Sequence, residues 1–342
     1  MFGNRSLVQA EPGPIIGPLS SFFGAILDFL YNFAYTITPT EAHTLGISII
    51  FLTIVSRILL FPLTYKSQKS MQAMQKLQPE MEKIKKKYEN QKSQDAQKKM
   101  GQEINKLYSE NGASPIMGCL PMLIQFPILM SLFFIMNQPY RFIGRLNMIY
   151  SELAQRVIDL FEMDVTGTLA TNYEIFFVVR DIAIDKIPAT MDLTLGYAPD
   201  LMRVLARFTS ADWQVFRDSV SPEAFEYIQP VLESKMATEY FLGITLVENV
   251  GFNFPAILIP IACVVFTFLS SYMSQKLQAK PKDPSAKMQQ TMMLVVMPAM
   301  MGVITFGMPA GLGLYWATGS VIQIAQQHFI GKWFKKPAVD VV

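Results

Sequence analysis

The stretch ISIIFLTIVSRILLFPLT, Ile47 to Thr64, has one arginine inside a run that is otherwise apolar enough to span a bilayer. Arg57 carries a guanidinium that stays protonated in proteins. It lies about six residues before the expected helix end, roughly 9 Å at 1.5 Å per residue. Two explanations follow: the side chain extends along the helix to the lipid head groups, or it lies in a wet, protein-lined cavity. An arginine near the bilayer centre costs at least about 2.5 kcal/mol, which favours the cavity.

The composition indicates a membrane protein rather than a soluble enzyme. Of 342 residues, 51% are hydrophobic and 16% charged, against about 25% charged in soluble domains. With only His43 and His328, histidine-rich metal sites are excluded, and the HExxH, GxSxG and P-loop motifs are absent. We therefore expect no catalytic residue, no metal and no cofactor. Cys119 and Cys263 both lie in apolar segments, where a thiol acts as a small hydrophobe, so we expect no disulfide.

Five apolar segments near the 20-residue length of a membrane span predict an all-α polytopic membrane protein with a five-transmembrane-helix core. The predicted spans are residues 42–65, 115–137, 251–274, 289–307 and 311–331. The remaining segments are a tail with an interfacial helix (1–41), a helical hairpin (66–114), a helical insertion (138–250), a loop (275–288) and a second tail (332–342).

The distribution of charge predicts the orientation of these spans. Residues 66–110 hold 11 Lys and 6 acidic residues, and residues 275–288 hold 4 Lys and 1 acidic residue. Residues 138–250 hold 9 Lys and Arg against 16 acidic residues. The positive-inside rule places the hairpin, the loop and the carboxyl terminus in the cytoplasm, with the amino terminus and the insertion outside.

The first apolar segment, residues 15–38, has two interpretations. Ser21, Ala25, Asp28 and Asn32 recur at helical spacing and form a narrow polar face. The opposite face is apolar and consists of Phe22, Phe23, Leu27, Leu30 and Phe33. A spanning helix would bring Asp28 near the middle of the membrane, so a helix lying in the interface is favoured.

The lysine-rich segment has the apolar spacing of two helices joined by a polar turn. The repeat comprises Met74, Leu77, Met81, Ile84 and Tyr88, followed by Met100, Ile104 and Leu107. These residues are expected to zip the two arms together, with Pro79 bending the first arm or marking where it restarts. The lysine surface, formed by Lys83, Lys85, Lys86, Lys87, Lys98 and Lys99, suits anionic lipid or ribosomal RNA. Charge does not separate these two targets.

Polar residues also recur inside the predicted spans. Thr53 lies one turn before Arg57. The others are Gln125, Tyr315, Trp316, Thr318, Ser320 and Gln323. Each alone is typical of a hydrogen bond between helices, whereas together with Arg57 they indicate a hydrated groove. No acidic residue lies in any of the five spans, which counts against a proton-coupled transporter. An unpaired cation in such a groove would attract acidic residues of a passing polypeptide.

Four segments in this order resemble the YidC family of membrane protein insertases: TIVSRILLFPLT, MQKLQPEMEKIKKKY, GCLPMLIQFPILMSLFF and GLGLYWATGSVIQIAQQ. The resemblance covers about residues 42–137 and 250–332. It implies a five-helix core around a hydrophilic groove that is open to cytoplasm and lipid. Arg57, Thr53 and Gln125 match groove residues of the family, and Trp316 matches an aromatic position implicated in substrate contact.

The sequence departs from the family pattern in three places. Ser320 stands where many members have asparagine, and the 138–250 insertion is longer than the usual connection, so nothing transfers to it from the family. The SPEAFEYIQPVLESKM segment predicts a helix there, with Ser221 as its cap and Pro222 in its first turn. The sequence also lacks the large amino-terminal domain of Gram-negative members and the lipobox cysteine of many Gram-positive members. Its short amino terminus resembles that of a Gram-positive-type insertase.

The resemblance therefore predicts a non-enzymatic insertase and chaperone, multi-pass in a bacterial cell membrane. Its partners would be nascent membrane proteins and membrane lipids, with the Sec translocon, the ribosome, and signal recognition particle and its receptor as candidates, and no DNA. One rival is a small-molecule transporter or channel, which predicts internal repeats and broken helices. The other is a passive chaperone that folds helices already inserted.

Overall fold

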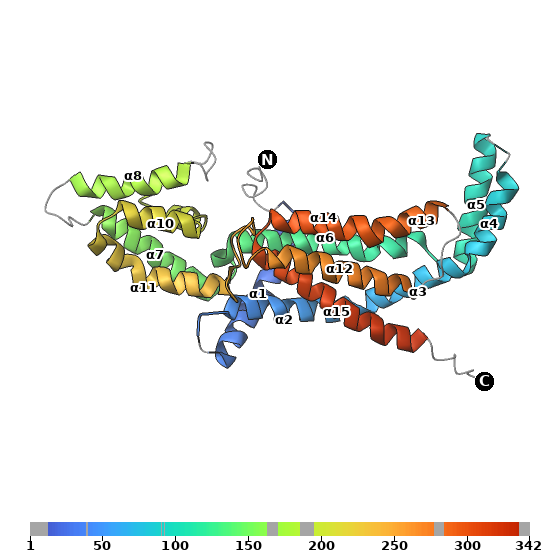
Figure 1. The fold of residues 1–342 in the computed structure, drawn as a ribbon, viewed down its shortest axis with the longest axis horizontal. Coiled ribbons are helices and arrows are strands. Elements are labelled where there is room, and N and C mark those ends of the chain that lie inside the picture. Colours follow the sequence, from blue (N-terminus) through green and yellow to red (C-terminus); the bar gives the residue numbers. More distant parts are fainter. Residues whose placement is uncertain are drawn as a thin grey trace. The chain divides into compact units, whose positions relative to one another are not determined.

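The structure is a computed structural model that describes residues 13–38, 40–89, 91, 93–162, 170–184, 195–276 and 284–334. These residues are mostly helical (Figure 1), which confirms the predicted all-α class. In chain order the helices of the first half are α1 (Ile16–Ile37), α2 (Thr44–Leu59), α3 (Phe61–Lys76), α4 (Gln78–Tyr88), α5 (Gln94–Glu110), α6 (Pro115–Asn137), η1 (Pro139–Arg141) and α7 (Gly144–Glu162). The others are α8 (Ala170–Ile184), α9 (Ala198–Leu205), α10 (Ser210–Ser219), α11 (Pro222–Glu239), α12 (Leu258–Lys276), α13 (Pro284–Thr291), the π-helical η2 (Met292–Val296), α14 (Met297–Phe306) and α15 (Ala310–Phe334). Most of the expected terminal tails and half of the 275–288 loop lie outside the described residues.

Two short strands between α11 and α12 form an antiparallel ribbon that the sequence did not predict. They are β1 (Tyr240–Phe241) and β2 (Ile244–Thr245). Tyr240 pairs with Thr245, and Phe241 pairs with Ile244.

The chain divides into two compact units, each described by itself below. The first comprises Met1–Leu52, Ile128–Ala256 and Gly307–Leu314; the second comprises Thr53–Pro127, Ile257–Phe306 and Tyr315–Val342. Helices α2, α6 and α15 each contribute residues to both units.

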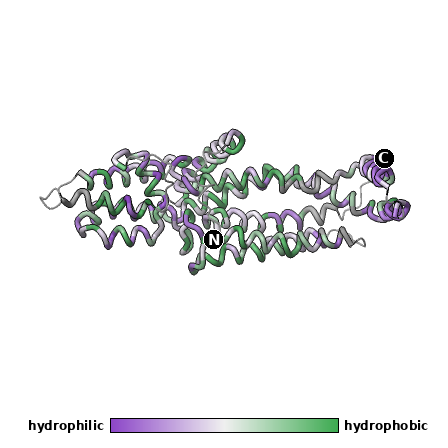
Figure 2. Tube along the Cα trace, turned by 90° about the horizontal axis from the view of Figure 1, so that it is seen from above, coloured by the Kyte–Doolittle hydropathy of each residue, from purple (hydrophilic) through white to green (hydrophobic). Residues whose placement is uncertain are grey.

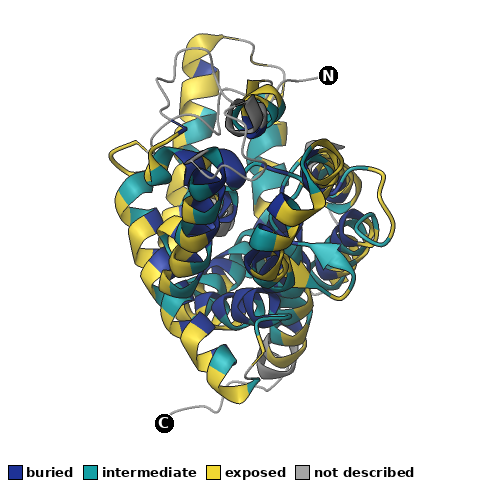
Figure 3. Cartoon of the chain, turned by 90° about the vertical axis from the view of Figure 1, so that its left-hand side faces the viewer, coloured by how far each residue is buried: buried dark blue, intermediate teal, exposed yellow. Residues whose placement is uncertain are grey.

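The first unit contains the predicted helical insertion, whose core forms where α7 packs against α9 and α11. Figure 3 shows the buried residues as dark blue stripes on helices whose other faces are exposed. The fully buried side chains of this core include Leu146, Leu153, Val157, Leu201, Phe216 and Ile228. At the start of α11 the Ser221 hydroxyl accepts a hydrogen bond from the Ala224 amide at 3.2 Å. This confirms the predicted cap, with Pro222 as the first helical residue.

The apolar residues of helix α1 divide into a buried set and an exposed set. Phe23, Leu27 and Leu30 are buried, whereas Phe22 and Phe33 are exposed. Phe22 and Phe33 are therefore not part of the protein core, and the interfacial position of this helix stays a prediction. On the polar face, the Asp28 carboxylate accepts a hydrogen bond at 2.9 Å from the backbone amide of Gly144, at the start of α7. A carboxylate is favourable at a helix amino terminus, so Asp28 faces protein.

In the second unit, α12 packs along α14. Among the described residues, α12 is the one helix that is by itself long and apolar enough to cross a membrane. α2 and α3 pass the same test together, with a 54° bend between them. Leu123–Asn137 and Met292–Phe306 are shorter apolar helices. The count of five spans remains a prediction.

The lysine-rich segment forms a hairpin in which α4 packs against α5. Its core contains Leu77, Tyr108 and Ala113, with Ala73, Met74, Met81, Ile104 and Leu107 around them. The apolar repeat therefore does zip the arms together. The helix breaks at Leu77 and Pro79 lies in the first turn of α4, as expected of a restart. Figure 2 colours these helices by residue hydropathy, and many of their residues are hydrophilic (purple).

Candidate functional site

Arg57 lies on α2 with its guanidinium against the backbone of α15. A Cβ added to Gly319 of α15 would lie 2.5 Å from Nη2 and 3.0 Å from Nε of Arg57. Any other residue at 319 would therefore push the guanidinium away. The Arg57 Nε is buried and has no hydrogen-bond partner among the described residues. The sequences of α2, α6, α12, α14 and α15 contain no Asp or Glu, so the cation has no carboxylate from these helices.

Tyr315 connects three of the apolar helices beside this arginine. It is fully buried on α15, one turn before Gly319, and therefore on the same side of the helix. Its hydroxyl accepts a hydrogen bond at 3.2 Å from the side-chain amide of Gln125 on α6. The Ser56 side chain of α2 also bonds to this hydroxyl, which lies within electrostatic reach of Arg57.

A second group of polar contacts joins α15 to α12. The Trp316 indole donates to the Thr267 hydroxyl at 3.0 Å. The Ser320 hydroxyl lies 3.3 Å from that of Thr267 and donates to the Trp316 carbonyl at 3.0 Å. One turn further along α12, Ser270 accepts a bond from Gln327 at 3.5 Å.

We call these residues the polar seam: Ser56, Arg57, Gln125, Thr267, Ser270, Tyr315, Trp316, Gly319, Ser320 and Gln327. The seam provides hydrogen-bond donors and one positive charge between apolar helices. Among the described residues, no group of three or more His, Cys, Asp or Glu is placed to hold a metal ion. The donors and the cation of the polar seam can solvate polar and anionic groups.

The structure brings together Arg57, Gln125 and Tyr315 of the predicted set, and it joins Trp316 to Ser320 through Thr267. Thr53 is fully buried one turn before Arg57. Thr318 and Gln323 are half-buried, and in the described part of the chain their side chains have no hydrogen-bond partner.

Sequence reasoning missed several seam residues. Thr267 and Ser270 are polar residues one turn apart in an apolar run, and Ser56 adjoins Arg57. These positions could have indicated that the three residues belong to the polar seam. Gly319 offered a weaker one, because it follows Tyr315 by one turn in a glycine-rich stretch.

The lysines of the hairpin form a separate candidate surface. Lys83, Lys86, Lys98 and Lys99 are exposed, and Lys85 is half-buried. Lys87 is also exposed, and its ammonium lies 2.7 Å from the Glu103 carboxylate of the other arm. This neighbour raises the pKa of Lys87 and lowers the pKa of Glu103. Lys87 therefore links the two arms of the hairpin.

A polar seam with a buried cation, built from the apolar helices of an all-α chain, is the arrangement expected of a helical membrane protein with a polar interior. The sequence matches the 60Kd inner membrane protein family over residues 37–337. The chain therefore belongs to this family.

Individual relatives carry the name membrane protein insertase YidC. The protein of Fusobacterium nucleatum is 29% identical over 313 residues, which is 90% of this chain and 98% of the relative. The protein of Oceanobacillus iheyensis is 26% identical, over 89% of this chain and 82% of the relative. The protein of Syntrophobacter fumaroxidans is 27% identical over 90% of this chain, but the match spans only 36% of that longer protein.

Proposed function

We propose that this chain is a membrane protein insertase that moves short polar tails and transmembrane segments of new proteins into the bilayer. The observation that carries the proposal is Arg57, a cation with a buried, unpaired Nε packed on Gly319 inside an apolar helix set without acidic residues. Burying such a charge is costly and is retained where it has a function. A transient acidic or polar segment would supply the partner that this site lacks.

The polar seam gives a physical route for insertion. A polar tail that enters hydrocarbon loses its hydrogen bonds to water, at a cost of several kcal/mol per unsatisfied group. Gln125, Tyr315 and Arg57 offer hydrogen bonds on one side of the path, while the apolar segment of the substrate enters lipid. The driving force is substrate burial together with the membrane potential, about 2.3 kcal/mol per charge per 100 mV. We propose no covalent chemistry, no cofactor and no nucleotide hydrolysis.

The proposal includes the orientation of the chain and its partners. The hairpin and the carboxyl terminus would face the cytoplasm, because lysine-rich segments beside membrane spans stay on the cytoplasmic side. The insertion and the amino terminus would then face the outside. The exposed lysines of the hairpin would meet anionic lipid, ribosome, or signal recognition particle and its receptor. The chain would act alone or beside the Sec translocon.

Reconstitution of the purified chain in liposomes tests the function. A single-span substrate with a short tail is offered, and the fraction of tails protected from external protease is measured. Insertion predicts protection that depends on the reconstituted chain. A passive chaperone would give no protection while still assisting the folding of helices already inserted.

Two substitutions test the role of Arg57. Arg57→Ala should reduce protection of substrates with acidic tails several-fold more than that of neutral ones, because the attraction to a carboxylate is lost. Arg57→Lys should largely retain both, because a point charge suffices. Equal loss for the two classes of tail would make the arginine a structural residue.

The rival transporter class finds little support in the helices. Its predicted signature is broken helices at the bilayer midplane. The 54° break between α2 and α3 occurs at Leu60, just before the lysine-rich segment and near the predicted end of the span. Pro62, in the first turn of α3, accounts for this break, because it cannot donate its own backbone hydrogen bond.

A further inference from the structure

Four apolar side chains near the ribbon are exposed to an unusual degree. Phe252 is 85% exposed, Phe254 80% and Leu242 71%, and Tyr240 is also exposed. Large apolar residues exposed together mark an interaction site. We call these four residues the apolar wedge.

The two loops that carry the wedge lie side by side. Gly243 has a φ of +88°, a left-handed conformation that suits glycine, in the turn between β1 and β2. A Cβ added there would lie 2.9 Å from Cγ of Pro255 and 3.7 Å from the Tyr240 hydroxyl. The ribbon turn therefore packs directly on the 252–255 loop.

The wedge is held by the amino-terminal turns of two functional helices. On the α2 side, the Tyr240 carbonyl accepts a bond from the His43 amide at 3.2 Å, and the Phe241 ring packs on Gly46. On the α15 side, the Leu246 carbonyl accepts a bond from the Gly311 amide at 2.8 Å. These helices carry Arg57 and Tyr315 further along.

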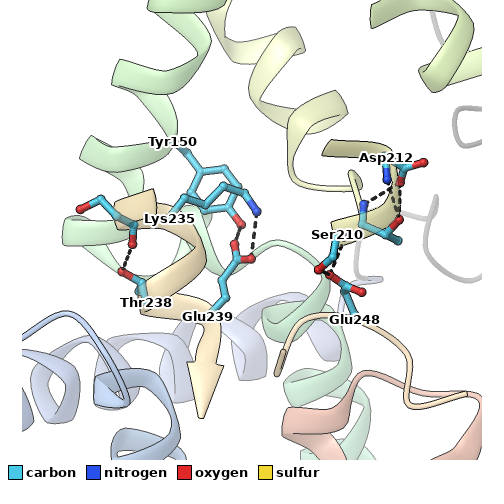
Figure 4. Close-up of polar contacts among 9 residues, drawn as sticks. Tyr150, Ser210, Asp212, Lys235, Thr238, Glu239 and Glu248 are labelled. Carbon is cyan, nitrogen blue, oxygen red and sulfur yellow. Dashed lines mark hydrogen bonds and ion pairs between the residues drawn. The ribbon is translucent and has the colours of Figure 1, made fainter. Parts of the chain in front are cut away.

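Hydrogen bonds within the insertion also hold the residues that flank the ribbon. Figure 4 shows Glu239, directly before β1, bonded to Lys235 and to the Tyr150 hydroxyl. Glu248, which follows β2, accepts bonds from the amide and hydroxyl of Ser210 at 2.9 and 2.8 Å, as Figure 4 also shows. Its backbone carbonyl accepts a bond from Ala310 at 2.9 Å. The side chains of the apolar wedge are thus exposed, while hydrogen bonds hold the backbone on both sides of the ribbon.

The apolar wedge lies close to the start of α12 in the chain, and this position indicates which partner contacts it. Phe254 precedes by four residues Leu258, the first residue of α12, which meets the criteria for a membrane span. An exposed apolar stripe runs along α12 through Leu258, Ile261, Val265, Phe268 and Tyr272. In a membrane protein this stripe meets lipid, so the residues just before it lie at the level of the interface, where aromatic side chains concentrate.

We propose that the apolar wedge inserts into the lipid interface and sets the depth at which α2 and α15 begin. The partner is the bilayer itself, at the boundary between head groups and acyl chains. The proposal rests on the membrane location of the family and not on insertase activity. It is therefore tested by depth and not by substrate insertion.

Hydroxyl-radical footprinting of the wild-type chain in nanodiscs is the first test. Phe252 and Phe254 should be oxidised several-fold more slowly than their exposure predicts. Tyr197 and Met148, exposed residues of the insertion, serve as references within the same sample. Oxidation of the two phenylalanines at the rate of these references would overturn the proposal.

Spin labelling separates lipid from protein as the cover. Nitroxides are placed singly at 252, 254 and, as the matched control, at the exposed Val215 of α10, in a Cys119→Ala/Cys263→Ala background. Labels at 252 and 254 should collide with oxygen and not with a water-soluble nickel complex, and the label at 215 should show the reverse. Collision with nickel at 252 and 254 would place the wedge in water. Protection from both reagents would mean that protein covers it, and either result overturns the proposal.

Discussion

Gly319 is the residue on which the position of Arg57 depends. Gly319→Ala would place a methyl group 2.5 Å from the present Nη2 position. The guanidinium ends a flexible side chain, so it would move rather than unfold the helix. We expect a several-fold loss in protection of acidic tails, with thermal stability unchanged or slightly raised, because alanine is favoured over glycine in helices by up to about 1 kcal/mol.

The matched control for this substitution is Gly101→Ala in α5, where an added Cβ meets nothing within 4 Å. Protease protection and thermal unfolding are measured for both variants. If Gly319→Ala leaves acidic tails unaffected, the guanidinium does not act from its position against α15.

At the residue scale, the sequence predicted the charged and amide members of the seam but not their contacts. Arg57 and Gln125 were recognisable because an unpaired polar group in a span demands a partner. Thr267 was not, because a hydroxyl in a helix can bond to its own backbone and so carries no sign of a tertiary partner. Gly319 matters through the side chain it lacks, and its spacing from Tyr315 does not show that the Arg57 guanidinium fills that space.

At the scale of elements, a buried charge pair within α11 is bonded to α7, because its Glu239 carboxylate accepts a hydrogen bond from the Tyr150 hydroxyl. Lys235 and Glu239 are 2.9 Å apart, with side chains only 2% and 3% exposed. Lys235→Met would leave the carboxylate buried without its cation, which typically costs about 3–5 kcal/mol. We expect hydrogen exchange of the α7 and α11 amides to accelerate strongly, and the double variant Lys235→Met/Glu239→Met to recover much of the protection.

The control pair for this comparison is Lys106 and Glu110 of α5, which has the same spacing, is exposed and is 3.9 Å apart. Lys106→Met should leave exchange of the hairpin nearly unchanged, since exposed pairs contribute little. A double variant of the buried pair no better protected than Lys235→Met alone would contradict the assignment of the loss to an unpaired charge.

The same network predicts how the insertion responds to alkali. Burial, and to a lesser extent the Glu239 carboxylate, raise the pKa of Tyr150 well above its ordinary value of 10.0. Because the raised pKa favours the neutral phenol in the folded state, this stabilisation is complete below pH 10. It is lost as the pH rises from there toward the folded pKa. Urea unfolding of the chain above pH 10 should show a steeper loss of stability than for Tyr150→Phe. Equal slopes would mean that Tyr150 does not titrate on unfolding.

Element positions were predictable where apolar periodicity is strong. The hairpin arms and the cap of α11 followed from spacing and from Ser221. The start of α12 was not predictable in this way. The helix begins at Leu258, seven residues after the expected start of the span, because the apolar residues before it form the 252–255 loop of the apolar wedge. Hydropathy measures transfer from water and does not distinguish a spanning residue from an interfacial one.

At the scale of the whole molecule, its two compact units could not be predicted from the sequence, because they depend on contacts between distant segments. Asp28 bonds to Gly144, Ser234 to Glu41, and Ala310 to Glu248. The spacing of residues along the chain does not predict these pairs. Charge distribution divides the chain into loops and spans, whereas contacts assign opposite ends of α2, α6 and α15 to different units.

At the scale of the whole chain, an insertase that hydrolyses no nucleotide should insert charged tails at a rate that depends on the membrane potential. A potential of 100 mV, positive in the compartment that receives the tail, contributes about 2.3 kcal/mol per negative charge. Protection of a tail with two acidic residues should therefore rise steeply when a potassium diffusion potential is imposed, and that of a neutral tail should not. Arg57→Ala should lower the protection of the acidic tail at every potential while leaving its dependence on potential intact, because the field acts on the tail and the arginine acts on its path. Loss of the potential dependence in Arg57→Ala would instead mean that the arginine itself moves through the field during insertion.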